Sequence, residues 1–144
     1  MENQKTKIPK WFWAVASFSL LWNLMGVSSF FQQLTMTGEA LKALPLAEQE
    51  LYNSYPLWTF IAFAFAVFGG IIGSIGLLMK KKWAKPAFII SLLAIIPQMI
   101  HTLFFTKAKE VYGSGTEIMP ILVIVFGIFL LWFSTIGIKK GWLK

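Results

Sequence analysis

Four long apolar segments constrain the fold of this chain more than any other feature. Lys and Glu are absent from residues 11–34, 55–79, 87–106 and 118–138, and the chain contains no Asp or Arg. Each segment has the roughly 20 residues that a helix needs to cross about 30 Å of hydrocarbon. Apolar residues make up 57% of the chain, above the about 45 to 50% typical of soluble domains. We therefore predict an all-α membrane protein, a bundle of four transmembrane helices over 11–34, 55–79, 84–106 and 117–138 within a single domain, 1–144.

The lysines predict how the bundle sits in the membrane. Of the 13 lysines, ten lie in the N-terminal tail, the connection between the second and third spans, and the C-terminal tail. The other three are Lys42, Lys107 and Lys109, on the opposite side. Positively charged loops stay in the cytoplasm, so this split predicts that both termini are cytoplasmic. It also assigns the net charge of +7 to the membrane face rather than to nucleic acid.

The segment 35–54 is the one sizeable connection outside the predicted spans. Leu41, Leu44, Leu46 and Leu51 give it an apolar side, which is typical of a short helix lying at the membrane surface. The segment is then either a connector that follows the membrane or a lid over the outer mouth of the bundle.

Two pairs of sequence matches suggest an internal duplication. Lys-Trp followed after seven residues by Ser-Leu-Leu occurs at 10–21 and again at 82–93, and the second and fourth spans both end in Ser, Ile and Gly before a Lys pair. The matches are compatible with two parallel two-helix repeats related by an axis along the membrane normal.

Small residues recur on one face of the second span. Their spacing of three or four residues places them along a single stripe, where small side chains let another helix approach closely. A different use of the glycines, bending at Gly69-Gly70, is the alternative. The predicted packing residues are Ala62, Ala66, Gly69, Gly73 and Gly76.

A few polar side chains fall inside the spans. An amide in hydrocarbon must find a partner, so each is either an interhelical hydrogen bond or a ligand contact. The only histidine is also the only group in the spans that titrates near neutral pH, and Pro97 interrupts the backbone bonding beside it. The candidate ligand-binding residues are Asn23, Ser29, Gln33, Gln98 and His101.

Catalysis is disfavoured by the residues that the sequence lacks. It has no Cys and a single His, so one chain cannot supply paired haem ligands or a thiolate metal site. No Gly-rich phosphate loop follows a strand. We predict no catalytic residue, no metal and no cofactor.

Several motifs resemble those of a family of small bacterial four-span inner-membrane proteins of unassigned function, some of whose members are labelled sugar transporter. They are Trp22-Asn23-Leu24 with Gly26-Val27, the loop 35–45, Tyr55-Pro56-Leu57-Trp58, Phe68-Gly69-Gly70, and Gln98 with His101. The likeness covers about the first three spans. It implies a bacterial inner-membrane location and identifies no site residues.

Two functions compete on this sequence. The first is a carrier or facilitator for a small uncharged polar solute, sugar-like in character, because neutral amides and hydroxyls beside aromatic rings suit such a ligand. It would act as a homo-oligomer, since four short helices enclose little volume. The second is an accessory membrane subunit that binds itself or a partner through the small-residue face of the second span.

Overall fold

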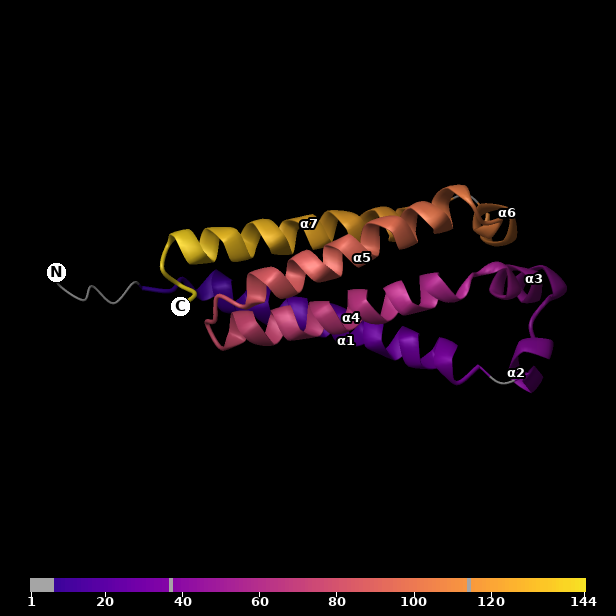
Figure 1. Cartoon of the computed structure of the whole chain (residues 1–144), viewed down its shortest axis with the longest axis horizontal. Coiled ribbons are helices and arrows are strands. Elements are labelled where there is room, and N and C mark those ends of the chain that lie inside the picture. Colours follow the sequence, from indigo (N-terminus) through magenta and orange to yellow (C-terminus); the bar gives the residue numbers. More distant parts are fainter. Residues whose placement is uncertain (1–6, 37, 114) are drawn as a thin grey trace.

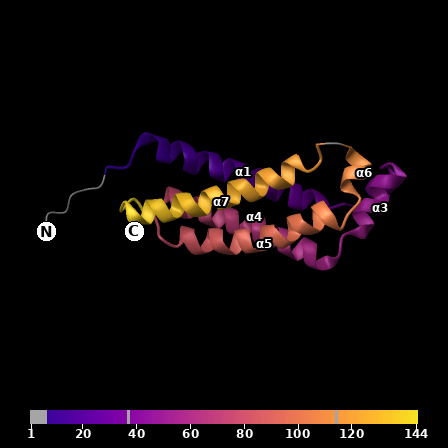
Figure 2. The ribbon, with the colours of Figure 1, turned by 90° about the horizontal axis from the view of Figure 1, so that it is seen from above.

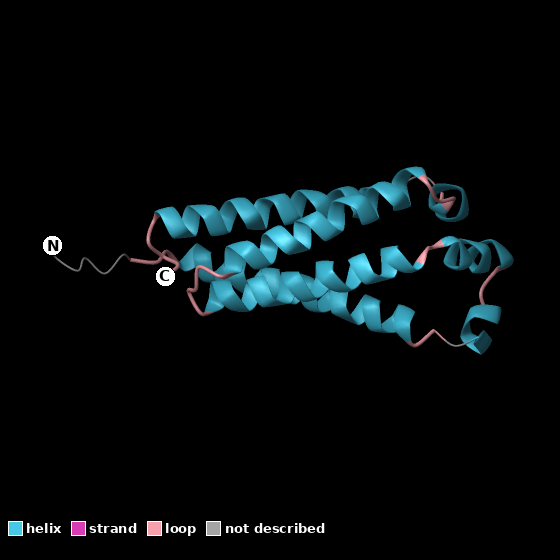
Figure 3. Cartoon of the chain, viewed as in Figure 1, coloured by secondary structure: helices cyan, strands magenta, loops and turns pink. Residues whose placement is uncertain are grey.

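The computed structural model is an elongated bundle of helices (Figure 1). It describes residues 7–36, 38–113 and 115–144. Within these ranges there is no strand, as Figure 3 shows. Four long helices form the bundle and three short helices connect them. The long helices are α1 (Lys10–Leu34), α4 (Leu57–Leu78), α5 (Ala84–Phe104) and α7 (Ile118–Lys139); the short ones are α2 (Gly38–Lys42), α3 (Leu46–Ser54) and α6 (Ala108–Tyr112).

The four long helices confirm the predicted four-span bundle. All four are long and apolar enough to cross a membrane, and their ends differ from the predicted spans by at most two residues. Proline positions explain several boundaries: Pro9, Pro45 and Pro56 directly precede α1, α3 and α4, where a missing N–H costs little. Pro97 alone lies deep inside a helix, where it cannot donate to the preceding turn.

The predicted surface helix between the first two spans is observed as two helices, α2 and α3. Of the leucines predicted for its apolar side, only Leu51 is buried, and Leu46 is exposed. The sequence analysis does not predict α6, which contacts α3. These three short helices lie together at one end of the bundle, which we call the capped end (Figures 1 and 2).

The opposite end, which we call the lysine-rich end, carries the start of α1, the connection between α4 and α5, and the C-terminal residues (Figure 1). Most of the buried core lies here. Trp142 and Leu143 fold back into it, and the backbone N–H of Lys144 donates to the carbonyl oxygen of Lys80 at 2.8 Å. This packing closes the bundle at this end. The core consists of Phe12, Ala16, Leu77, Ala84, Phe88, Leu130, Phe133, Trp142 and Leu143.

Helix α4 packs closely on two neighbours, α1 and α5, and α5 packs in turn on α7. By contrast, α1 and α7 meet through aromatic rings, including Phe12 with Phe133 at 5.4 Å between centroids and Trp22 with Phe126 at 5.1 Å. In Figure 1 the two helices separate toward the capped end. The long helices therefore lie closer together at the lysine-rich end than toward the capped end.

The glycines of α4 allow both α1 and α5 to approach it closely. A Cβ atom at Gly69 or Gly73 would lie within 3.1 Å of a side-chain atom of α5, and one at Gly70 would overlap Asn23 of α1. The adjacent pair Gly69-Gly70 thus brings two helices close to α4 from different sides. Gly76 also faces α5, through Ala84, and Ala66 is buried while Ala62 is partly buried. Within the chain, α5 therefore packs against the Gly69, Gly73 and Gly76 part of this face.

The two halves of the chain do not pack in equivalent ways. A two-fold axis along the membrane normal would make the α4–α5 contact equivalent to a contact between α7 and α1, and only the first is close. Ser19 and Ser91 begin the Ser-Leu-Leu matches of the two halves. In a repeated arrangement Ser19 would bond to α4 and Ser91 to α7, but both serines bond to α4. The short sequence matches between the halves therefore do not correspond to a repeated packing arrangement.

The close approach at Gly73 can be tested by enlarging its side chain. A Cβ there would lie 2.6 Å from a ring atom of Phe88, which is almost fully buried. Gly73→Leu should lower the free energy of unfolding by about 1 to 3 kcal/mol, the usual effect of overpacking, as measured by unfolding in detergent micelles. The control Ile72→Leu, on the exposed face, should change it by less than about 0.5 kcal/mol. Equal stability of the two variants would contradict the α4–α5 packing.

Candidate functional site

A chain of hydrogen bonds joins α1 and α4 at the middle of the bundle. Ser74 Oγ donates to the carbonyl oxygen of Gly70 at 2.8 Å. Since that uses its single hydrogen, Ser19 Oγ, 2.6 Å from Ser74 Oγ, is the donor between the two hydroxyls. Asn23 Nδ2 donates to the Ser19 carbonyl oxygen at 2.8 Å and to Ser74 Oγ at 3.3 Å. Asn23 thus forms the interhelical hydrogen bond that one reading of the sequence predicts.

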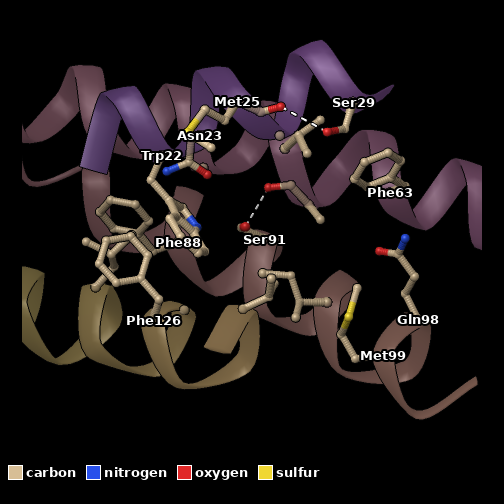
Figure 4. Close-up of a pocket in the computed structure, with 18 of the residues that line it drawn as sticks. Trp22, Asn23, Met25, Ser29, Phe63, Phe88, Ser91, Gln98, Met99 and Phe126 are labelled. Carbon is tan, nitrogen blue, oxygen red and sulfur yellow. Dashed lines mark hydrogen bonds between the residues drawn. The ribbon is translucent and has the colours of Figure 1, made fainter. Parts of the chain in front are cut away.

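A cavity of about 240 Å³ lies beside this cluster, among all four long helices. We call it the inner compartment; Figure 4 shows Trp22 and Phe126 directed toward each other at one end of it, and Gln98 and Met99 at the other. Its lining contains no Lys, Glu or His among the described residues. The residues that define its character are the polar Asn23, Ser29, Ser91 and Gln98, the aromatic Trp22, Phe63, Phe88 and Phe126, and Met25, Met99 and Met119.

Most polar hydrogens of the inner compartment are already used by the protein. Asn23 donates twice to the polar cluster, Ser91 donates to the carbonyl oxygen of Ala66 at 2.6 Å, and Ser29 donates to that of Met25 at 3.2 Å. Gln98 differs, because its side-chain oxygen Oε1 is buried and has no hydrogen-bond partner among the described residues. A bound molecule would therefore find its clearest hydrogen-bond acceptor at Gln98.

A larger cavity of about 640 Å³ lies toward the capped end, and we call it the outer compartment. It shares Phe63, Gln98, Met99, Met119 and Val123 with the inner compartment, so the two compartments are adjacent. Its lining is richer in hydroxyl and amide groups and, within the described part of the chain, again has no Lys, Glu or His. These polar residues are Gln33, Tyr52, Tyr55, Thr59, Gln98, Thr102, Tyr112 and Thr116.

Tyr112 of α6 remains a neutral phenol at the outer compartment. Burial raises its pKa above the ordinary value of 10.0, and the nearby carboxylate of Glu48 in α3 raises the pKa further. Because a raised pKa favours the protonated form of a phenol, Tyr112 keeps its O–H at neutral pH. It can therefore donate a hydrogen bond to a ligand.

His101 does not line either compartment. Its imidazole ring packs among aromatic rings, 5.3 Å from Trp58, 5.9 Å from Tyr55 and 6.0 Å from Phe105 between centroids. Its Nδ1 atom is buried without a partner among the described residues. The only histidine is thus placed in an aromatic cluster at the α4–α5 contact and is not among the residues that line either compartment.

The structure does not bring the five candidate ligand-binding residues to one cavity. Asn23 and Ser29 line the inner compartment, Gln33 the outer one, and Gln98 both, whereas His101 lines neither. Sequence reasoning missed Ser74, Tyr52, Tyr112 and the three cavity methionines. A signal for Ser74 does exist: Gly70 and Ser74, four residues apart, form a second small face of α4 beside the predicted one.

Comparisons with known proteins supply no further information on this site. No family model matches the chain, and neither the curated proteins nor the solved structures contain a significant match. The resemblance to small bacterial four-span proteins stays a prediction.

The hydroxyl pair Ser19 and Ser74 can be tested by a double-mutant cycle. Replacing each by Ala, singly and together, should reveal a coupling energy of about 0.6 kcal/mol, with about 1.7 kcal/mol as the upper range for membrane helices. The readout is the free energy of unfolding in micelles. In the matched cycle of Ser28→Ala with Ser74→Ala, the effects should add, because Ser28 is exposed on α1. Additive effects in the first cycle would contradict the bond.

Proposed function

We propose that this protein is a carrier or facilitator for a small uncharged molecule with polar groups. The observation that carries the proposal is the pair of adjacent cavities, a polar outer compartment and a more apolar inner one, which share Gln98 and its buried, unpartnered oxygen. Ligand sites are typically concave and mostly apolar, with a few polar groups that fix orientation. The inner compartment has this character.

The lining supports an uncharged ligand. A charged molecule in the membrane interior would need an opposite charge or many dipoles to replace its hydration, and no Lys, Glu or His lines the described cavity. The position of His101 outside the cavity gives no support to proton coupling at the ligand. Facilitated passage therefore suits the site better than proton-driven uptake.

The two ends of the bundle support alternating access. The outer compartment lies toward the capped end, while the aromatic core closes the lysine-rich end. Transfer of a solute would require Phe12, Phe133 and Trp142 to separate, since their rings lie 5.4 to 5.7 Å apart. A single chain encloses both compartments, so the proposal needs no second copy, and homo-oligomerisation stays a prediction.

The proposed orientation has the capped end outside and both termini in the cytoplasm of a bacterial cell. It rests on the excess of lysines at the opposite end, which favours retention of that end inside. In this orientation the cavity opens to the exterior.

Solute flux tests the proposed function. Purified protein in liposomes should take up a small uncharged solute from a panel of sugars and other polar compounds in a saturable manner. Gln98→Leu removes the junction acceptor and should reduce the apparent affinity about tenfold, the effect of losing roughly one hydrogen bond. The matched control Gln32→Leu removes an exposed amide of α1 that lines neither compartment, and it should behave as wild type. Folded protein that transports nothing from the panel would contradict the proposal.

Reporter fusions test the proposed orientation. Green fluorescent protein fused after Lys144 should fluoresce, because it folds in the cytoplasm, and alkaline phosphatase at that position should be inactive. Alkaline phosphatase inserted after Lys42, in the connection between α2 and α3, should be active because it reaches the oxidising exterior. The reverse pattern of activities would place the capped end in the cytoplasm.

A further inference from the structure

The cavity becomes less polar with depth. The outer compartment presents three tyrosines and three threonines beside Gln33. In the inner compartment, by contrast, aromatic rings and methionines predominate. A molecule that filled both compartments would therefore need a hydroxylated part on one side of Gln98 and an apolar part on the other.

The inner compartment also reaches the side of the bundle between α1 and α7. Met25 of α1 and Met119 of α7 line it, yet they are 63% and 53% exposed. Trp22 and Phe126 close the gap between these helices toward the lysine-rich end (Figure 4). On the capped side of Trp22, no aromatic pair among the described residues joins α1 to α7. The compartment thus has an opening that would face lipid.

We propose that the ligand is a neutral amphiphile of the outer membrane leaflet, which enters between α1 and α7. Its hydroxylated head would occupy the outer compartment, its apolar tail the inner one, and a hydroxyl near their junction would donate to Gln98 Oε1. This inference rests on the proposed function, because it names the ligand class of the same cavity.

The match between the cavity and a leaflet supports this ligand. In the proposed orientation, the outer compartment lies at the level of the headgroups and the inner one at the level of the acyl chains. An amphiphile in the outer leaflet already has its head and tail at these depths. It could therefore move sideways into the cavity without turning and without exposing its tail to water. A free sugar has no apolar tail to place against the methionines and aliphatic side chains of the inner compartment.

Binding to the full chain in lipid nanodiscs tests the inference. The probe is 2-naphthyl β-glucoside, which is uncharged and carries a hydroxylated head on an apolar ring system, and glucose is the matched head alone. After subtraction of binding to empty nanodiscs, the glucoside should bind at least about tenfold more tightly than glucose, because its ring system buries apolar surface. Gln98→Leu should weaken this binding, and Gln32→Leu should not.

A pair of adjacent substitutions tests the entry route. Ser29 lines the inner compartment beside the opening and Ser28 does not, although both are exposed on α1. Ser29→Trp should weaken binding of the glucoside at least about tenfold by occupying the opening, a loss equivalent to one decade in Kd, whereas Ser28→Trp should bind as wild type. An unchanged melting temperature verifies that each variant is folded. Met25→Phe, which narrows the same opening, replaces Ser29→Trp if that variant does not fold.

The outcomes separate the two proposals. The proposal of an amphiphilic ligand is supported if the glucoside binds tightly and Gln98→Leu weakens this binding. It also requires that Ser29→Trp blocks the binding and Ser28→Trp does not. If glucose binds as tightly as the glucoside and shows saturable flux, the proposal of an amphiphilic ligand is overturned. The proposal that the protein is a carrier is then retained. Entry between α1 and α7 is overturned if the Ser29→Trp variant binds the glucoside as wild type does. It is also overturned if Ser28→Trp lowers the affinity for the glucoside as much as Ser29→Trp does. Absence of both binding and flux for every compound, from folded protein, would overturn both proposals.

Discussion

The close approach of α4 to both of its neighbours is the contact on which the rest of this bundle depends. Gly69 admits α5 and Gly70 admits α1, and the hydrogen bonds among Ser19, Asn23 and Ser74 fix the second approach. Without a hydrophobic drive between helices in lipid, such packing and interhelical hydrogen bonds are the main sources of association. One helix therefore organises three of the four spans, and α7 is placed through α5.

The cavity is a consequence of this unequal packing. Because α7 has no small-residue face against α1, the two helices stay apart and are bridged by aromatic rings only from Trp22 and Phe126 toward the lysine-rich end. Beyond these rings the space between the four helices remains unfilled and widens toward the short helices. The same rings that hold α1 and α7 together thus form the floor of the inner compartment.

The sequence predicts the spans well because hydropathy reports the solvent around a segment, and lipid imposes a nearly fixed length on each helix. It predicts the Gly69, Gly73 and Gly76 face for a similar reason, since helical spacing is a local property. It does not tell which helix meets that face, and the structure shows that α5 does. His101 illustrates the same limit. Its place in the chain suggests the cavity, but the rotation of α5 directs it to Tyr55 and Trp58 instead. The short α6 and its tyrosine lie outside the apolar segments, where hydropathy carries little information.

Gln98 gives the strongest reason to regard the cavity as more than a packing defect. A buried acceptor without a partner costs about 1 to 3 kcal/mol, and replacing it by an apolar side chain of similar size would remove that cost. Buried side-chain atoms of His101 and Glu117 also lack partners within the described chain, but neither of those residues lies at the inner compartment. Gln98 alone presents its unpartnered oxygen where the two compartments meet. A donor that arrives from outside the protein would satisfy this oxygen, and the described lining offers no Lys, Glu or His to pair with a charged one.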